Sequence, residues 1–127
     1  MLTSVPGSSA SVRGGIVSYV NEVKAEVLGV SEDVLARQGA VDELVALQMA
    51  RGALRELGSD VSVAVTGIAG PTGAEPGQAG GRRCGSAAPP PKRTHAAMPS
   101  FARRPRGRAP ATVLIALRTM EEALASF

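Results

Sequence analysis

The sequence predicts an α/β fold, with helices that flank a sheet. Two short β-branched runs alternate with stretches of helical periodicity, and a helical period returns at the end of the chain. Of 127 residues 44% are hydrophobic but only 2% are aromatic, so aliphatic side chains must build the core. Such a composition is typical of a parallel sheet covered by helices. The length suits one compact domain.

The first predicted elements are a strand and two short helices. The run GGIVSYV predicts a strand over Ile16–Val20. Asn21 is a candidate N-cap for the next helix, and Gly29 is a candidate stop. Ser31 then caps a second helix, which has acids in its first turn and ends at Gly39.

The longest periodic stretch is VDELVALQMARGALRELG, and Gly58 marks its C-terminal end. Met49 lies on its apolar face, where we expect it to fill the core rather than serve a cofactor. The other residues predicted on this face are Ala46, Ala50, Ala53, Leu54 and Leu57.

A small-residue loop follows the second predicted strand, Val61–Val65. In open α/β sheets ligands bind at the carboxyl ends of strands, and a Gly-rich turn lets backbone N–H groups approach an anion. Many such loops only make a tight turn, and the spacing fits neither a Walker A loop nor the dinucleotide fingerprint. The candidate substrate-binding residues are Thr66, Gly67, Ile68, Ala69 and Gly70.

Positive charge is concentrated in one segment. Residues 1–77 carry a net charge of −4 and residues 111–127 a net charge of −1, whereas residues 78–110 contain eight Lys or Arg and no acid. This segment has no helical or strand period, so we expect it to be irregular and disordered. Its charge would suit nucleic acid, but it offers one aromatic side chain, Phe101, and no known module. We therefore do not expect a nucleic-acid partner.

Other features favour a cytoplasmic protein. No run is long enough for a membrane span, and the start of the sequence lacks the pattern of a signal peptide. The single cysteine, Cys84, has no partner for an internal disulfide. We expect no membrane contact.

Three polar residues of the N-terminal region invite comparison with a catalytic set. Ser9 precedes Tyr19 by ten residues, and Lys24 follows five later. Their ordinary structural interpretation is a helix cap, a half-buried strand residue and a solvated lysine. No histidine is near in sequence, because the only one, His95, lies in the basic segment. The residues alone leave both interpretations open.

Residues 2–73 resemble the CinA C-terminal domain family, the nicotinamide-nucleotide amidases. The motifs that carry the resemblance are VPGSS, GGIVSYVNEVK, LGV, GAV and AVTGIAGP, in that order. The resemblance implies an α/β fold and hydrolysis of the carboxamide of nicotinamide mononucleotide, without metal or cofactor. It also implies that Ser9, Tyr19 and Lys24 are the catalytic set, with Ser9 as nucleophile, Lys24 as base and Tyr19 as orienting or relay residue.

The chain departs from the family pattern in two places. The family's first strand and its Glu-Ser-Cys-Thr-Gly-Gly loop are missing, and the expected continuation after residue 73 is scrambled. We therefore expect an incomplete α/β core over 1–73, an irregular segment over 74–110 and a final helix of the same domain over 111–127. Open strand edges and an open apolar helix face would favour marginal stability or a homo-oligomer.

The genetic code suggests an origin for the basic segment. When each codon is read from its second base, residues 78–82 permit Lys-Pro-Val-Gly and residues 103–106 permit Gly-Asp-Arg, two motifs that the family has in this order. We therefore expect residues 74–110 to be a frameshifted translation. Two functional hypotheses remain: an amidase with a small-molecule nucleotide substrate, or a non-enzymatic remnant or competence- or damage-related binding protein.

Overall fold

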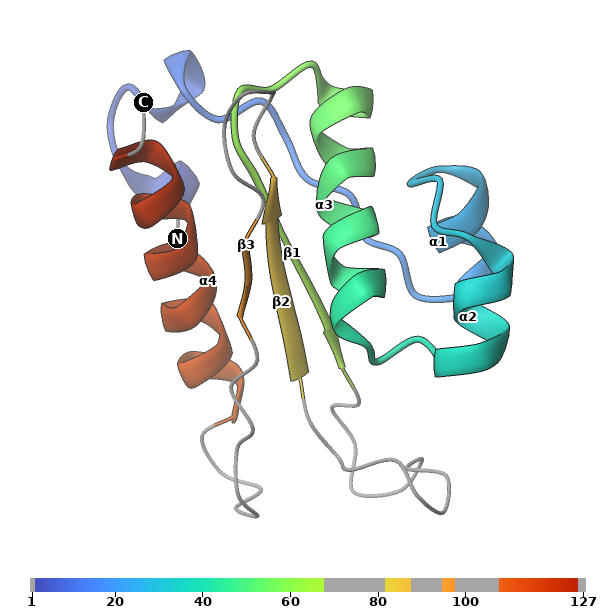
Figure 1. Cartoon of the computed structure of the whole chain (residues 1–127). Coiled ribbons are helices and arrows are strands. Elements are labelled where there is room, and N and C mark those ends of the chain that lie inside the picture. Colours follow the sequence, from blue (N-terminus) through green and yellow to red (C-terminus); the bar gives the residue numbers. More distant parts are fainter. Residues whose placement is uncertain (1, 68–81, 88–94, 98–107, 126–127) are drawn as a thin grey trace.

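The computed structural model of the chain describes residues 2–67, 82–87, 95–97 and 108–125, and it confirms the α/β class (Figure 1). Two 3-10 turns open the chain, η1 and η2. The elements are η1 Leu2–Ser4, η2 Ser8–Ala10, α1 Asn21–Glu26, α2 Glu32–Gln38, α3 Glu43–Leu57, β1 Ser62–Gly67, β2 Arg82–Ala87, β3 His95–Ala97 and α4 Arg108–Ala125. Among the helices described, none is long and apolar enough to cross a membrane.

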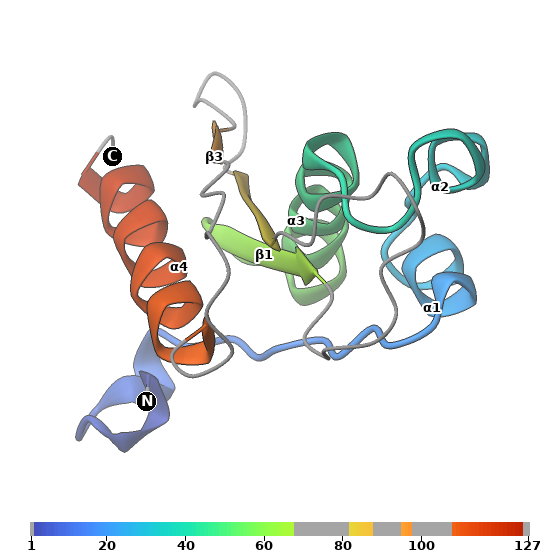
Figure 2. The same cartoon turned by 90° about the horizontal axis from the view of Figure 1, so that it is seen from below.

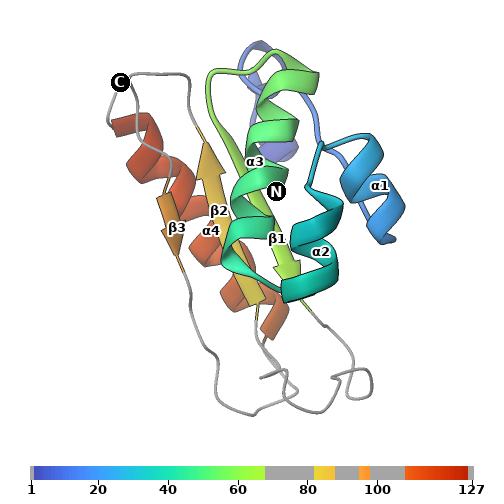
Figure 3. The ribbon, with the colours of Figure 1, turned by 45° about the vertical axis from the view of Figure 1, so that its right-hand side comes forward.

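The elements form layers around a three-stranded sheet in the order β1-β2-β3. Helices α3 and α4 both contact the sheet, and Figure 3 shows them on opposite faces. The short helices α1 and α2 lie on the outer side of α3, as the view from below shows (Figure 2). One face of the sheet is thus covered by two helical layers, and the other by α4.

The strands pair antiparallel, so the expected parallel sheet is wrong for the described residues. Val65 of β1 lies opposite Cys84 of β2, and Gly85 of β2 lies opposite Ala96 of β3. The aliphatic composition reflects burial of the sheet between helices on both faces. It carries no information on strand direction.

Two strands lie where we expected an irregular segment. Both β2 and β3 fall within residues 78–110, and the first turn of α4 begins there too. The sequence of β2, RRCGSA, has no β-branched residue, and local propensity therefore did not reveal it. Its strand conformation comes from pairing along the whole of β1. The rest of the segment lies outside the described residues.

The predicted strand Ile16–Val20 is also wrong. Residues 12–19 have no assigned helix or strand and cross the molecule toward α1 (Figure 2). Val17 and Tyr19 are 92% and 94% exposed, whereas Ile16 and Ser18 are half-buried. Exposed and half-buried side chains therefore alternate as in a strand. In the part of the chain that the structure describes, however, no strand pairs with this segment.

The cap predictions for the first helix are wrong: the N-cap position of α1 is Val20 rather than Asn21, and the helix ends at Glu26, before Gly29. The predictions for the next two helices are confirmed. The Ser31 hydroxyl accepts a hydrogen bond from the backbone N–H of Val34, and Gly39 ends α2. Gly58 ends α3 with a φ of 55°. Met49 is 6% exposed and belongs to the core, as predicted. The buried core residues are Leu28, Val30, Leu35, Val45, Met49, Ala50 and Ala64.

Candidate functional site

Lys24 is the one buried lysine or arginine among the side chains that the structure describes. It lies on α1, and only 5% of its surface is exposed. Its Nζ donates hydrogen bonds to the carbonyl oxygens of Ser18 and Tyr19, each at 3.2 Å. The residues that lead into α1 thus fold back over the side chain and take two of its hydrogen bonds.

Burial lowers the pKa of Lys24 from its usual 10.5, and the nearby Glu22 carboxylate opposes this with a smaller effect. A neutral amine has two N–H donors and one lone pair. The two carbonyls can accept both N–H bonds, so a lone pair remains for another proton donor. This arrangement is suited to a general base.

Tyr19 contributes its backbone to Lys24 but not its side chain. The side chain is 94% exposed, and the described residues include no hydrogen-bond partner for its hydroxyl. The structure thus brings Tyr19 and Lys24 together through a main-chain carbonyl. The sequence pattern could not predict the hydrogen bonds from Lys24 to the carbonyls of Tyr19 and Ser18, because every residue type has a main-chain carbonyl.

Ser9 lies on the exposed turn η2, near the N-terminus. Figures 1 and 2 both show this N-terminal region beside α4, whereas α1 with Lys24 lies beyond α3. The structure therefore does not bring Ser9 to Lys24. The capping interpretation is not supported either: no side chain caps η2, and the Ser8 hydroxyl donates instead to the Thr3 carbonyl at 3.4 Å.

Two residues of the predicted ligand loop are described. Thr66 is 6% exposed, and its hydroxyl donates to the Ala40 carbonyl at 2.6 Å. This bond ties β1 to the connection between α2 and α3. Gly67 ends β1 and is exposed. Ile68, Ala69 and Gly70 lie outside the described residues.

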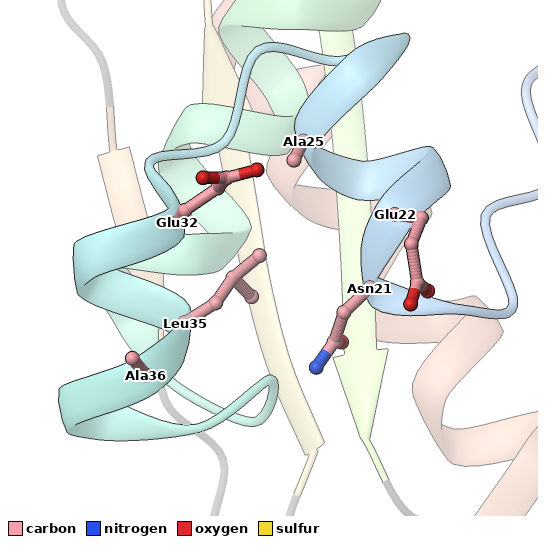
Figure 4. A pocket seen from close by; sticks show the side chains of 6 residues that line it. All are labelled: Asn21, Glu22, Ala25, Glu32, Leu35 and Ala36. Carbon is pink, nitrogen blue, oxygen red and sulfur yellow. The ribbon is translucent and has the colours of Figure 1, made fainter.

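A pocket of about 280 Å³ opens between α1 and α2 (Figure 4). Its lining includes the carboxylates of Glu22 and Glu32 and no basic side chain, so it is poorly suited to a phosphate. The other lining residues are Asn21, Ala25, Leu35 and Ala36. The described residues also contain no group of three side chains able to hold a metal ion.

The chain matches known proteins in sequence and in structure. A CinA-like protein from Mycolicibacterium gilvum is 52% identical over 87 residues, which cover 68% of this chain and 21% of that protein. A CinA-like protein from Mycobacterium marinum is 58% identical over 72 residues, 57% of this chain and 17% of that protein. The chain thus spans about a fifth of the length of these curated relatives.

Solved structures match over most of the chain. The competence/damage inducible protein CihA from Agrobacterium tumefaciens has a TM-score of 0.86 at 36% identity, covering 96% of this chain and 74% of that one. The competence damage-inducible protein A from Klebsiella pneumoniae gives 0.86 at 31% identity, covering 98% and 76%. The family model for the CinA C-terminal domain matches residues 1–124. The chain therefore belongs to the CinA C-terminal domain family.

Proposed function

We propose that the chain carries the amidase chemistry that its family resemblance implies, with the carboxamide of nicotinamide mononucleotide as substrate. The single observation that supports this is Lys24, a buried amine whose N–H groups have two carbonyl acceptors. Burial lowers the pKa of this amine and so increases its neutral fraction, which a general base requires.

The proposed reaction uses a serine ester. Lys24 removes the hydroxyl proton of Ser9 as its oxygen attacks the carboxamide carbon. Ammonia leaves with a proton relayed by Lys24 or Tyr19, and an acyl-enzyme ester remains. Water then hydrolyses the ester and regenerates the serine. The products are nicotinate mononucleotide and ammonia.

This mechanism requires Ser9 to reach Lys24, and in the arrangement described here they lie apart. Attack distances for such reactions are about 3–3.5 Å, and misplacement by about 1 Å can reduce rates by about 100-fold. We therefore expect the chain by itself to show little turnover.

A non-enzymatic binding role is the second candidate function. The separation of Ser9 from Lys24 favours this role, and so does the solvent exposure of the Tyr19 side chain. A protein of this kind would bind nicotinamide mononucleotide without hydrolysing it, or would act in the competence and damage responses for which the relatives are named.

Ammonia release from nicotinamide mononucleotide tests the proposal. Slow release that is abolished in Ser9→Ala and Lys24→Met, but retained in the neighbouring exposed control Ser11→Ala, would support the amidase. Calorimetric binding of the nucleotide without ammonia release would support the binding role. Release that is unchanged in Ser9→Ala would refute the proposed nucleophile.

A further inference from the structure

One face of α3 receives the chain that leaves α1. Gln48 and Gly52 are four residues apart in this helix and therefore lie on the same face. The chain that meets them is the α1–α2 connection, residues 27–31, and Figure 2 shows α1 and α2 on that side of α3. A Cβ at Gly52 would overlap the Leu28 carbonyl, so the backbones of α3 and the connection are in direct contact there.

Gln48 supplies a side-chain contact to the same connection. The backbone N–H of Ser31 donates a hydrogen bond to Gln48 Oε1 at 2.9 Å, and this bond is partly buried. The Ser31 hydroxyl is engaged elsewhere, because it accepts a hydrogen bond from the N–H of Val34. Loss of the Gln48 acceptor would therefore leave a partly buried N–H without this partner and weaken the attachment of the connection to α3.

The α1–α2 connection also holds the main chain of Lys24. The backbone turns at Gly29, which has a φ of 68°, and the N–H of the next residue, Val30, donates to the Lys24 carbonyl oxygen at 3.0 Å. Ser31 follows Val30 directly. The hydrogen bond to Gln48 thus fixes the connection one residue beyond the point where it holds Lys24.

We propose that Gln48 is a positioning residue for Lys24 and acts through the α1–α2 connection. The inference rests on the proposed function only in naming Lys24 as the base. Without the Gln48 acceptor, burial of its apolar side chains alone holds the connection on α3, and the Val30 N–H can shift relative to the Lys24 carbonyl. Water then gains access to the amine. Because desolvation lowers the pKa of Lys24, this access should raise the pKa toward 10.5 and reduce the neutral fraction of the base.

NMR titration of the Lys24 amine tests the proposal. The sequence contains two lysines, Lys24 and Lys92, so ¹³Cε-labelled lysine gives two signals, which Lys24→Met assigns. Gln48→Met removes the acceptor at a similar side-chain length, and we expect the Lys24 midpoint to move up toward 10.5. Gln48→Asn keeps an amide that is one carbon too short, and it should shift the midpoint in the same direction. All Gln48 variants retain the Glu22 carboxylate, whose charge also acts on Lys24.

Ser62→Ala is the matched control for a general loss of stability. It removes the hydrogen bond that the Ser62 hydroxyl donates to the Ala50 carbonyl at 2.6 Å, on the side of α3 that faces β1. Like Gln48→Met, it should lower the urea concentration at which the chain unfolds. Unlike Gln48→Met, it should leave the Lys24 titration at the parent value.

A double-mutant cycle tests the route through Ser31. The φ of Ser31 is −62°, which suits proline, so Ser31→Pro removes the N–H that Gln48 accepts. In this background Gln48→Met should cause no further shift of the Lys24 midpoint. In a Ser31→Ala background, which loses the hydroxyl cap but keeps the N–H, Gln48→Met should keep its full effect.

Three outcomes would each overturn the proposal: an unchanged Lys24 titration in Gln48→Met, an equal shift in Ser62→Ala, or a full further shift in the Ser31→Pro background. The titration does not depend on turnover. A chain that shows the predicted shift but releases no ammonia would therefore refute the amidase and leave the role of Gln48 intact. In a chain that does release ammonia, Gln48→Met should slow release more at about pH 7 than at about pH 10, where the amine is largely neutral in both chains.

Discussion

Gly52 is the position where the structure predicts the sharpest effect of a single methyl group. It lies within α3, on the side that faces the chain after α1. A Cβ built at Gly52 would come within 2.0 Å of the Leu28 carbonyl oxygen and 2.6 Å of the Leu28 carbonyl carbon. The obstacle is backbone, so a rotamer change cannot relieve it.

The magnitude follows from two opposing effects. Forcing an extra carbon into a packed site typically costs about 1–3 kcal/mol, and more where backbone must move. Alanine gains about 1 kcal/mol over glycine in a helix interior. Because the contact falls far inside normal separation, we expect overpacking to dominate. Gly52→Ala should thus lose about 2 kcal/mol of unfolding free energy.

Urea unfolding followed by circular dichroism measures this loss. Gly15→Ala is the matched control, because a Cβ there meets no atom within 4 Å. That control should be neutral or more stable by about 0.5 kcal/mol, since alanine restricts the unfolded chain. If Gly52→Ala unfolded at the same urea concentration as the parent chain, the close approach of α3 to Leu28 would be refuted.

Three further predictions concern Lys24, Thr66 and the coding sequence. At pH values between the lowered pKa of Lys24 in the folded chain and 10.5, the unfolded chain binds more protons than the folded chain. The unfolding free energy should therefore rise with pH through this window. This rise should be smaller in Lys24→Met when urea unfolding is compared at about pH 8 and about pH 10, and equal slopes would contradict burial of the amine. Thr66→Val keeps the side-chain shape but leaves the partly buried Ala40 carbonyl without its donor, so it should lose about 1 kcal/mol in the same assay. An unchanged midpoint would show that this bond is dispensable. Sequencing the gene should show Lys-Pro-Val-Gly over residues 78–82 and Gly-Asp-Arg over 103–106 in the shifted frame; if neither appears, the frameshift proposal fails.

Helices were predictable here because their signals are local. Ser31 and Gly39 bound α2, and Gly58 ends α3, as capping chemistry requires. Met49 also follows from a 3.6-residue period that any single helix displays. Each of these features depends on residues within a few positions of one another.

The strands were less predictable because a strand requires a partner. Residues 16–20 alternate as a strand would, yet no described strand pairs with them. The reverse holds for β2, whose Arg, Gly and Ser residues are poor strand formers. Its six residues each lie opposite a residue of β1, and main-chain hydrogen bonding does not depend on side-chain identity.

The same reasoning explains how much of the site could be found in advance. Only the family resemblance implied that Lys24 is a base, and the structure shows that its side chain is buried rather than solvated. What holds the amine is main chain: the carbonyls of Ser18 and Tyr19, which the turn into α1 presents to Nζ. Any substitution that leaves this turn intact should keep the amine buried, whatever side chain stands at Tyr19. A catalytic role for the Tyr19 hydroxyl, by contrast, requires the exposed ring to leave solvent. Structural and catalytic contributions of Tyr19 are therefore separable: Tyr19→Phe should preserve the Lys24 environment and, if the relay operates, reduce ammonia release.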